Sequence, residues 1–250
     1  MEAFDWWSDA HAHPGSGAEQ GQRVRDGVFT LLCAGDPETA KKLLSAPMKQ
    51  ARWCVPTCGV HPWQADKIAL ADMEPYMAAA PVVGEIGMDS LWCAVPLKTQ
   101  EEAFRRQLAF AAQAGKSVIL HTKGQEKEIA AILPEYPNRY LVHWYSCGEH
   151  LENYLALDCY FSVGPDVFWN PAVRRVAQTV PLDRLLVETD GMAAVAWAWE
   201  QAPGEKKRPP DSPKAALWAT LQSLAALRGL PLETLGEITK ANLLRFLGKE

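Results

Sequence analysis

Eight short apolar runs, separated by stretches with helical spacing, constrain the fold of this chain more than any other feature. The runs are FDWWSDAH, VFTLLCAG, WCVPTCGVHP, PVVGEIG, SVILHT, RYLVHW, LDCYFSVG and RLLVETD. The stretches between them, such as NPAVRRVAQTV, place apolar residues three and four positions apart, as amphipathic helices do. Strands that alternate with helices form parallel sheets. Eight repeats favour an α/β fold, a single (β/α)8 barrel of the TIM type, over an open doubly wound sheet, although strand number alone does not exclude the latter.

The length of the chain agrees with such a barrel. The chain has 250 residues, of which 48% are hydrophobic and 22% charged, as in ordinary globular proteins. We predict one barrel domain over residues 1–250, and two smaller domains are the alternative that this length allows. The one linker-like segment, residues 200–213, is rich in proline and charge. It would follow the last strand, either as a lid over the mouth of the barrel or as a plain surface loop, and the role of 191–213 stays open.

The sequence shows neither a membrane-spanning nor a secretory pattern. No uninterrupted apolar run reaches the roughly 18 residues that a membrane span needs, and the start MEAFDWWSDA has neither a basic region nor an apolar signal core. The six cysteines are scattered along the chain, which indicates reduced thiols; Cys54 and Cys58 are a weak candidate for zinc binding. We expect a cytoplasmic protein that does not bind membranes, with no obligate protein partner implied.

The most informative polar side chains stand where the apolar runs end. They are His11 and His13 after the first run, His61 after the third, Glu85 in the fourth, His121 after the fifth, His143 after the sixth, and Glu188 with Asp190 after the eighth. In a (β/α)8 barrel the carboxyl ends of the strands form the catalytic face. The pattern therefore predicts a site at that face.

The spacing of Asp9, His11 and His13 indicates that this site binds metal. On a strand, residues two apart point to the same side, about 6.7 Å from one another, so the two imidazoles converge. Imidazole is a common ligand of transition metals. Solvated or packed histidines at a strand end are the alternative.

A hydrolytic metal site needs neutral nitrogen donors and anionic oxygen donors that hold divalent ions and leave a position open for water. The ends of the apolar runs supply donors for two ions: His11, His13 and Asp190 for one, His121 and His143 for the other, with Glu85 as a bridge. A bound metal lowers the pKa of water from about 15.7 to about 7. We therefore expect a metal-bound hydroxide as nucleophile and Asp190 as the group that accepts or passes on its proton. A packed His143 and a salt-bridged Glu85 are the alternatives, and Zn, Mg and Mn all stay open.

Taken together, these motifs resemble the TatD family of metal-dependent hydrolases, which have amidohydrolase-like barrels. The family's segments occur in order over nearly the whole chain: DAHAH at 9–13, GVHP at 59–62, VGEIGMD at 83–89, Gln100 with Phe104, VILH at 118–121, LVH at 141–143, LLVETD at 185–190, and closing helices that contain Asn242. The resemblance implies six metal ligands: His11, His13, Glu85, His121, His143 and Asp190. It also implies that His61 faces the substrate instead of binding metal. From the chemistry of the site we expect Glu85 and Asp190 to be the catalytic residues.

Several loops depart from the family pattern. The family usually has an arginine where this chain has Lys123 and an acidic residue where it has Gly124. Lysine keeps the charge but loses the planar fork that binds a phosphate through two hydrogen bonds. Ser90 and Leu91 replace the aromatic residue that usually follows the Gly-x-Asp motif. We expect Lys123 to contact the substrate.

Two further departures concern tryptophan and loop length. The stretch from His143 to Gly148 has one residue more than the family pattern. After Asp190, a segment with Trp197 and Trp199 replaces a small residue and a proline. The two indoles either wall an apolar pocket, stack on a base, or belong to the core.

The resemblance gives one main functional hypothesis and two alternatives. Characterised members of the family include deoxyribonucleases, which are phosphodiesterases, and a branch that removes D-amino acids from transfer RNA. We therefore predict hydrolysis of DNA or another phosphodiester, with a nucleic-acid 3′ end as one option. The alternatives are metal-dependent hydrolysis of a carboxylic ester, amide or lactone, including aminoacyl-ester deacylation, and a non-catalytic metal-binding barrel. The full set of ligand types argues against the last.

The charge of the chain bears on the choice of substrate. The formal net charge of −5 argues against broad, non-specific wrapping of nucleic acid, which needs many Lys and Arg side chains. A local phosphate site stays compatible with that charge. Lys123 and the run Lys206, Lys207 and Arg208 favour an anionic substrate, although a solvated loop also explains the run.

Overall fold

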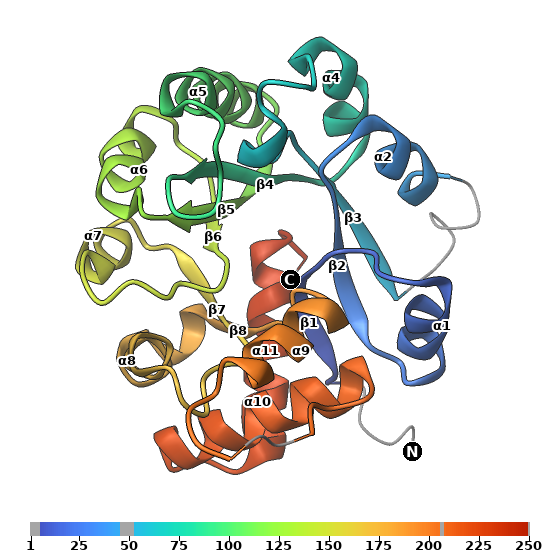
Figure 1. Cartoon of the computed structure of the whole chain (residues 1–250), viewed down its shortest axis with the longest axis vertical. Coiled ribbons are helices and arrows are strands. Elements are labelled where there is room, and N and C mark those ends of the chain that lie inside the picture. Colours follow the sequence, from blue (N-terminus) through green and yellow to red (C-terminus); the bar gives the residue numbers. More distant parts are fainter. Residues whose placement is uncertain (1–5, 46–52, 206–207, 250) are drawn as a thin grey trace. The chain divides into compact units, whose positions relative to one another are not determined.

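The computed structural model describes residues 6–45, 53–205 and 208–249, which form a (β/α)8 fold (Figure 1). One sheet of eight strands follows the order of the chain. The strands are β1 Ser8–Ala12, β2 Phe29–Ala34, β3 Cys54–Cys58, β4 Val82–Asp89, β5 Ser117–Lys123, β6 Tyr140–Val142, β7 Tyr160–Val163 and β8 Leu185–Val187. A parallel bridge between Ala12 and Asp190 makes the first and last strands neighbours. The predicted barrel is confirmed.

Helices follow the strands as their spacing predicts. They are α1 Gly17–Arg25, α2 Pro37–Leu43, α4 Leu70–Ala79, α5 Leu97–Gln113, α6 Glu126–Ile132, α7 Leu151–Ala156, α8 Pro171–Thr179, α9 Met192–Glu200, α10 Pro213–Arg228 and α11 Leu232–Phe246. Short 3-10 helices span Pro62–Gln64, Leu133–Glu135 and Leu182–Arg184. Asp36, Asn170 and Ser212 cap α2, α8 and α10 by accepting a backbone N–H, and a proline follows each cap, which is a strong signal for a helix start.

The segment predicted as a lid or a surface loop has little regular structure in its described part. Glu200 ends α9, and between it and Pro213 the described residues form neither helix nor strand. Lys206 and Lys207, two of the three basic residues in the run that favours an anionic substrate, lie outside the described residues. In the described part of the chain, no helix has the length and apolar character that crossing a membrane requires.

The chain divides into two compact units. The first unit consists of residues 1–31, 143–148 and 160–250, and the second consists of residues 32–142 and 149–159. The prediction of one domain over residues 1–250 stays a prediction.

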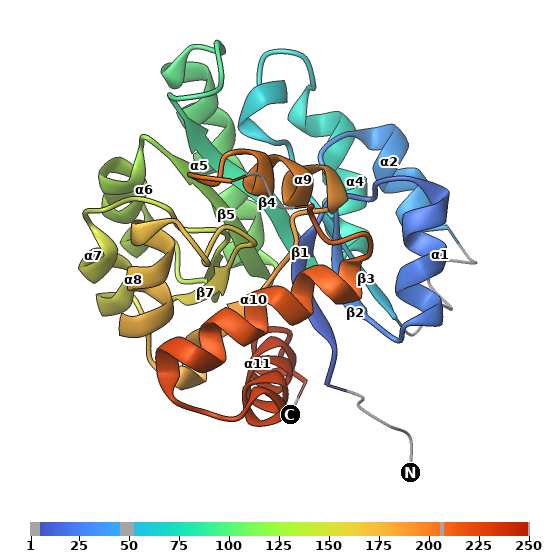
Figure 2. The same cartoon turned by 60° about the horizontal axis from the view of Figure 1, so that its bottom comes forward.

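In the first unit, α10 and α11 pack on each other, and α11 packs on β1 and β8 (Figure 2). Asn242, in α11, donates hydrogen bonds of 2.7 Å to the carbonyl oxygens of Leu182 and Leu185. These bonds attach α11 to the start of β8. They also account for the asparagine that the sequence places in the closing helix.

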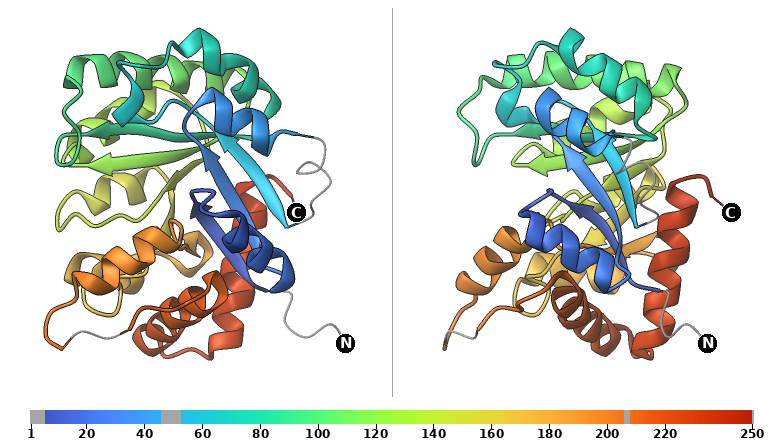
Figure 3. Two further views of the ribbon diagram at one scale, coloured as in Figure 1. Left: turned by 45° about the vertical axis from the view of Figure 1, so that its right-hand side comes forward. Right: turned by 90° about the vertical axis from the view of Figure 1, so that its right-hand side faces the viewer.

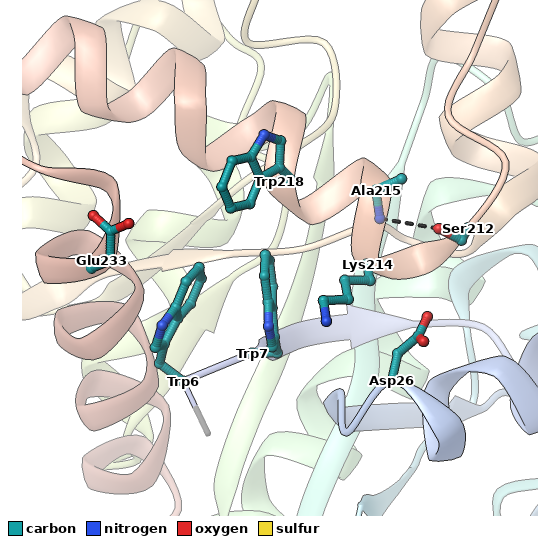
Figure 4. A pocket seen from close by; sticks show the side chains of 8 residues that line it. All are labelled: Trp6, Trp7, Asp26, Ser212, Lys214, Ala215, Trp218 and Glu233. Atoms are coloured by element: carbon teal, nitrogen blue, oxygen red, sulfur yellow. Dashed lines mark hydrogen bonds between the residues drawn. The ribbon is translucent and has the colours of Figure 1, made fainter. Parts of the chain in front are cut away.

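A pocket of about 530 Å³ lies in the first unit, at the amino-terminal start of β1 (Figure 4). Its walls include Trp6, Trp7 and Trp218, with ring centroids 4.1 Å apart for Trp6 and Trp7 and 5.9 Å apart for Trp7 and Trp218. The ammonium of Lys214 lies 5.1 Å from the Trp7 ring centroid. Because a strand rises about 3.3 Å per residue, this pocket is at the opposite end of β1 from His11 and His13.

In the second unit, β3, β4, β5 and β6 pair in parallel, and α5 packs along β4 (Figure 3, green). The register of β4 against β5 shifts between Val83 and Ile86. Gly87 follows this irregularity with a φ of +156°, and a Cβ there would overlap the carbonyl oxygen of His121. Only glycine therefore allows the ends of β4 and β5, which carry Glu85 and His121, to approach this closely.

Candidate active site

One group of candidate ligands lies in the first unit, and we call it the histidine–aspartate cluster: His11, His13, His143 and Asp190. The Nε2 atoms of His11 and His13 lie 3.3 and 3.6 Å from Oδ1 of Asp190. The rings of His11 and His143 are 4.5 Å apart between centroids. His11, His143 and Asp190 each offer a donor atom, and these atoms lie within 4.8 Å of one another.

The backbone brings Asp190 to the histidines. The N–H of Asp190 donates to the carbonyl oxygen of His11 at 3.0 Å, which joins the end of β1 to the residues after β8. Asp190 has a φ of +58°, in the left-handed region that residues other than glycine rarely adopt. Such backbone strain is concentrated at functional sites.

The charge state of Asp190 follows from its neighbours. Burial alone raises the pKa of this carboxyl, but the imidazoles of His11, His13 and His143 outweigh burial and hold the pKa below its ordinary value. Asp190 is therefore a carboxylate at neutral pH.

Glu188 was noted in the sequence but given no role, and the structure places it beside His143. Its Oε1 lies 3.4 Å from Nδ1 of His143, and its Oε2 accepts a hydrogen bond of 2.5 Å from Ser162. Glu188 is completely buried. A carboxylate beside one ring nitrogen orients an imidazole and leaves the other nitrogen available as a donor to a metal.

The second group lies in the second unit, and we call it the glutamate–histidine cluster: His61, Glu85, Asp89 and His121. Nδ1 of His121 lies 2.6 Å from Oε1 of Glu85, and its Nε2 lies 3.0 Å from Oδ2 of Asp89. Nε2 of His61 is 3.5 Å from Oε1 of Glu85. His61, Glu85 and His121 offer donor atoms within 4.8 Å of one another.

The hydrogen bonding of His61 indicates its tautomer. Its Nδ1 accepts the backbone N–H of Trp63 at 3.2 Å, which assigns the ring proton to Nε2. In this tautomer Nε2 is a hydrogen-bond donor and would have to lose its proton before it could bind a metal. The geometry is compatible with the predicted substrate contact, which stays a prediction.

Asp89, the last residue of the VGEIGMD motif, belongs to this cluster although its sequence context does not indicate a role. Its carboxylate accepts hydrogen bonds from Trp63 Nε1 at 2.6 Å and from the backbone N–H groups of Leu91 and Trp92, both at 2.8 Å. Burial raises the pKa of Asp89, but the bonds from His121, Trp63 and Trp92 hold it well below its usual range. The spacing in the sequence does indicate that Asp89 lies near Glu85, because residues four apart on one strand share a face.

Lys123 ends β5 beside this cluster. It pairs with Asp89 in the register of the two strands, and its carbonyl oxygen accepts the N–H of Ser90 at 2.9 Å. The lysine is half-buried at the same strand ends as Asp89.

The two tryptophans of α9 differ in exposure. Trp197 is 37% exposed, and its ring centroid lies 6.1 Å from that of Trp144. Trp199 is half-buried and packs on Phe168 at 4.6 Å between centroids. Trp199 thus has the packing of a structural residue, and Trp197 stays partly accessible to solvent.

Each cluster has donors that fit a divalent ion. The first combines imidazoles with the carboxylate of Asp190, and the second combines imidazole nitrogen with the carboxylate of Glu85. Mixed nitrogen and oxygen donors of this kind suit Zn and related divalent metals. Two parts of the predicted arrangement, a shared ion for His121 and His143 and a bridging Glu85, join residues of both units and stay predictions.

Comparison with known proteins identifies the family. Residues 8–248 match the family model described as TatD related DNase. The chain belongs to this family. A Pectobacterium carotovorum protein named 3′-5′ ssDNA/RNA exonuclease TatD is 28% identical over 229 residues, which cover 86% of this chain and 86% of that protein. The Escherichia coli protein named uncharacterized metal-dependent hydrolase YcfH is 30% identical over 206 residues, which cover 76% of this chain and 72% of that protein.

The fold agrees with that of a solved TatD homologue. The crystal structure of YJJV from Escherichia coli superimposes with a TM-score of 0.80 at 23% identity and covers 96% of this chain and 97% of that one. At this identity the likeness shows the fold alone. Family membership confirms the resemblance seen in the sequence, and with it the prediction of a metal-dependent hydrolase of the TatD type.

Proposed function

We propose that this TatD-family chain is a 3′ exonuclease that cleaves phosphodiester bonds at the end of single-stranded DNA or RNA. The names of its relatives support the class of substrate. The observation that carries the proposal is the histidine–aspartate cluster. In it, a ring nitrogen of His11, a ring nitrogen of His143 and a carboxylate oxygen of Asp190 lie within 4.8 Å of one another. This is the donor set that hydrolytic metal enzymes use.

The proposed metal ligands are the six that the family pattern implies: His11, His13, Glu85, His121, His143 and Asp190. A divalent ion held by them would supply Lewis acidity toward a phosphate oxygen and lower the pKa of a water molecule. Metal analysis of protein purified without chelator gives the number of bound ions and identifies them as Zn, Mg or Mn.

The protein side chains would then position the substrate and move its protons. Asp190, kept ionised by the neighbouring imidazoles, would accept the proton of the attacking water. Glu85, only 1% exposed, would hold His121 in a fixed orientation through its contact at 2.6 Å. His61 would donate a hydrogen bond from Nε2 to a phosphate oxygen. Lys123 would add a positive charge at the carboxyl end of β5.

A comparison of substrates tests this proposal. The protein is purified without chelator, its metals are measured, and it is assayed on 5′-labelled single-stranded DNA and RNA, a phosphomonoester, a lactone and an aminoacyl ester. The proposal expects progressive shortening of the labelled strand from its 3′ end, which stops when a chelator removes the metal. Metal-dependent hydrolysis of the lactone or aminoacyl ester, with the labelled strands intact, would instead favour the alternative hypothesis that the protein hydrolyses carboxylic esters, amides or lactones.

We also propose that the protein works in the cytoplasm. The six cysteines occur as thiols and not as disulfides, and this supports a reducing compartment. Fractionation of cells that express the tagged full-length chain would check this.

A further inference from the structure

Large apolar side chains lie exposed on the two loops that follow β3 and β4. Trp63 is 41% exposed, Leu91 66% and Trp92 57%. We call these three residues the rim patch. Burying an indole removes about 150–250 Å² from water, so a chain that leaves two of them exposed forgoes that stabilisation. Exposed apolar patches of this kind mark binding surfaces.

One carboxylate holds the rim patch in place. Oδ2 of Asp89 accepts a hydrogen bond from the indole Nε1 of Trp63, and Oδ1 accepts the backbone N–H groups of Leu91 and Trp92. The patch is therefore preorganised, because both loops are attached to the buried end of β4.

The same carboxylate connects the rim patch to the candidate active site. Oδ2 of Asp89 also lies 3.0 Å from Nε2 of His121. The ring of Trp63 stands nearly perpendicular to the rings of His61 and His121, with centroids 5.1 and 6.4 Å away. The indole of Trp63 and the imidazole of His121 thus contact the same carboxylate oxygen of Asp89.

Two departures from the family pattern are physically coupled at this rim. A Cβ at Gly124 would collide with the side chains of Ser90 and Leu91, and Gly124 has a φ of +70°. A larger residue at position 124 would therefore need the side chains of Ser90 and Leu91 to move and would have to adopt a positive φ. Lys123 stands opposite Asp89 in the register of β5 against β4, so the same strand ends carry a cation beside the apolar side chains of the rim patch.

We propose that Trp63 and Trp92, with Leu91 beside them, form a platform on which bases of a single-stranded nucleic acid stack. The inference rests on the proposed function and names how that site recognises its substrate. Indole faces stack on any base, while a nearby cation binds the backbone. Binding therefore depends on the presence of bases but only weakly on their identity, and a duplex end, whose bases are already stacked on each other, binds less well.

Trp92 is the position to change, because Trp63 also contacts Asp89 and through it the candidate active site. Binding is measured by fluorescence anisotropy on full-length protein in excess chelator, with a labelled oligothymidylate and a strand of equal length whose last residues are abasic. Trp92→Ala is expected to weaken binding of the normal strand by about 5-fold or more, since stacking on one aromatic side chain contributes on the order of 5- to 150-fold per base. Binding of the abasic strand should stay unchanged.

Three further variants identify the cause. Trp92→Phe keeps an aromatic face and should retain most of the affinity, whereas Trp92→Leu keeps apolar area without that face and should behave as Trp92→Ala. Trp218→Ala removes another exposed indole, also 41% exposed but at the pocket near the start of β1, and should leave both strands bound as in wild type. Circular dichroism and the melting temperature confirm that each variant is folded.

The outcomes separate this inference from the proposed function. Equal binding of normal and abasic strands by wild type, or equal affinities of wild type and Trp92→Ala, would overturn the platform and assign the rim patch to another partner, such as a protein. Base-dependent binding without hydrolysis of any nucleic acid would support the platform and refute the exonuclease. Hydrolysis with no contribution from Trp92 would support the exonuclease and refute the platform.

Discussion

Arg23 donates a hydrogen bond from Nη1 to Oδ2 of Asp9 at 2.5 Å, and both side chains are completely buried. Nη2 of the same guanidinium donates to Oγ1 of Thr189 at 3.0 Å, and the N–H of Thr189 donates to Oδ1 of Asp9 at 2.9 Å. Asp9 stands two residues before His11, and Thr189 directly precedes Asp190. The buried ion pair therefore fixes the two chain segments that carry His11, His13 and Asp190 of the histidine–aspartate cluster.

Replacing Arg23 by Met should destabilise the protein strongly, because it leaves the Asp9 carboxylate buried without a positive charge beside it, held only by hydrogen bonds from Thr189. Breaking a buried pair in this way costs about 3–5 kcal/mol, measurable as a shift in the urea unfolding midpoint. Lys42→Met removes an exposed pair with Glu38 and is the control, expected to leave the midpoint unchanged. Equal midpoints for Arg23→Met and wild type would mean that the pair does not hold these segments.

Glu85→Gln should abolish most hydrolysis, whichever substrate is right, because the variant keeps the shape of the side chain but loses its charge toward metal and His121. A loss of more than about tenfold in kcat is expected, equal to about 1.4 kcal/mol of barrier. Glu135→Gln, which alters an exposed carboxylate paired with Arg105, serves as the matched control. If Glu85→Gln keeps more than about a tenth of the wild-type rate, Glu85 is structural.

Lys123→Ala should lower kcat/KM for phosphodiesters and leave neutral esters and lactones unaffected. Loss of a charge-assisted contact with the phosphate corresponds to about 1.5–3 kcal/mol, or roughly 10- to 150-fold. Lys123→Arg should restore the rate, because guanidinium also binds phosphate. Unchanged rates on every diester, at both low and moderate salt, would place Lys123 outside the substrate site.

Two thiols should resist alkylation at neutral pH. Burial, with a smaller contribution from Cys33, raises the pKa of Cys58 to about 12, and burial raises that of Cys159 to about 12 as well. Only the thiolate reacts, so both should stay unmodified by iodoacetamide at about pH 8, while the partly exposed Cys93 is labelled. Peptide mass spectrometry measures the labelling of each cysteine separately. Labelling of Cys58 as fast as that of Cys93 would show that the Cys58 thiol is not protected by burial.

The fold and most candidate ligands could be predicted because their signals are local. The alternation of strands and helices, and the placement of His11, His121 and Asp190 at strand ends, follow from short segments read one at a time. A resemblance over nearly the full length then supported both.

The supporting residues depend on contacts between distant parts of the chain, which local patterns do not reveal. Asp89 acquires its role by binding Trp63, 26 residues earlier. Arg23 is fully buried, although arginine is normally exposed; its hydrogen bonds to partners that include Asp9 and Thr189 explain this. Gln100 appeared in the sequence as part of a motif, but its function, which is to bind both the N–H and the carbonyl oxygen of Asp89, required the structure.

The sharpest test of the metal site is the metal content of a His11→Ala/His13→Ala variant. The variant should bind less metal than wild type by elemental mass spectrometry and lose hydrolysis of single-stranded oligonucleotides. It should keep the wild-type circular dichroism spectrum, because residues at strand ends contribute little to the core. A folded variant with the metal content of wild type would contradict the assignment of these histidines and of the site built around them.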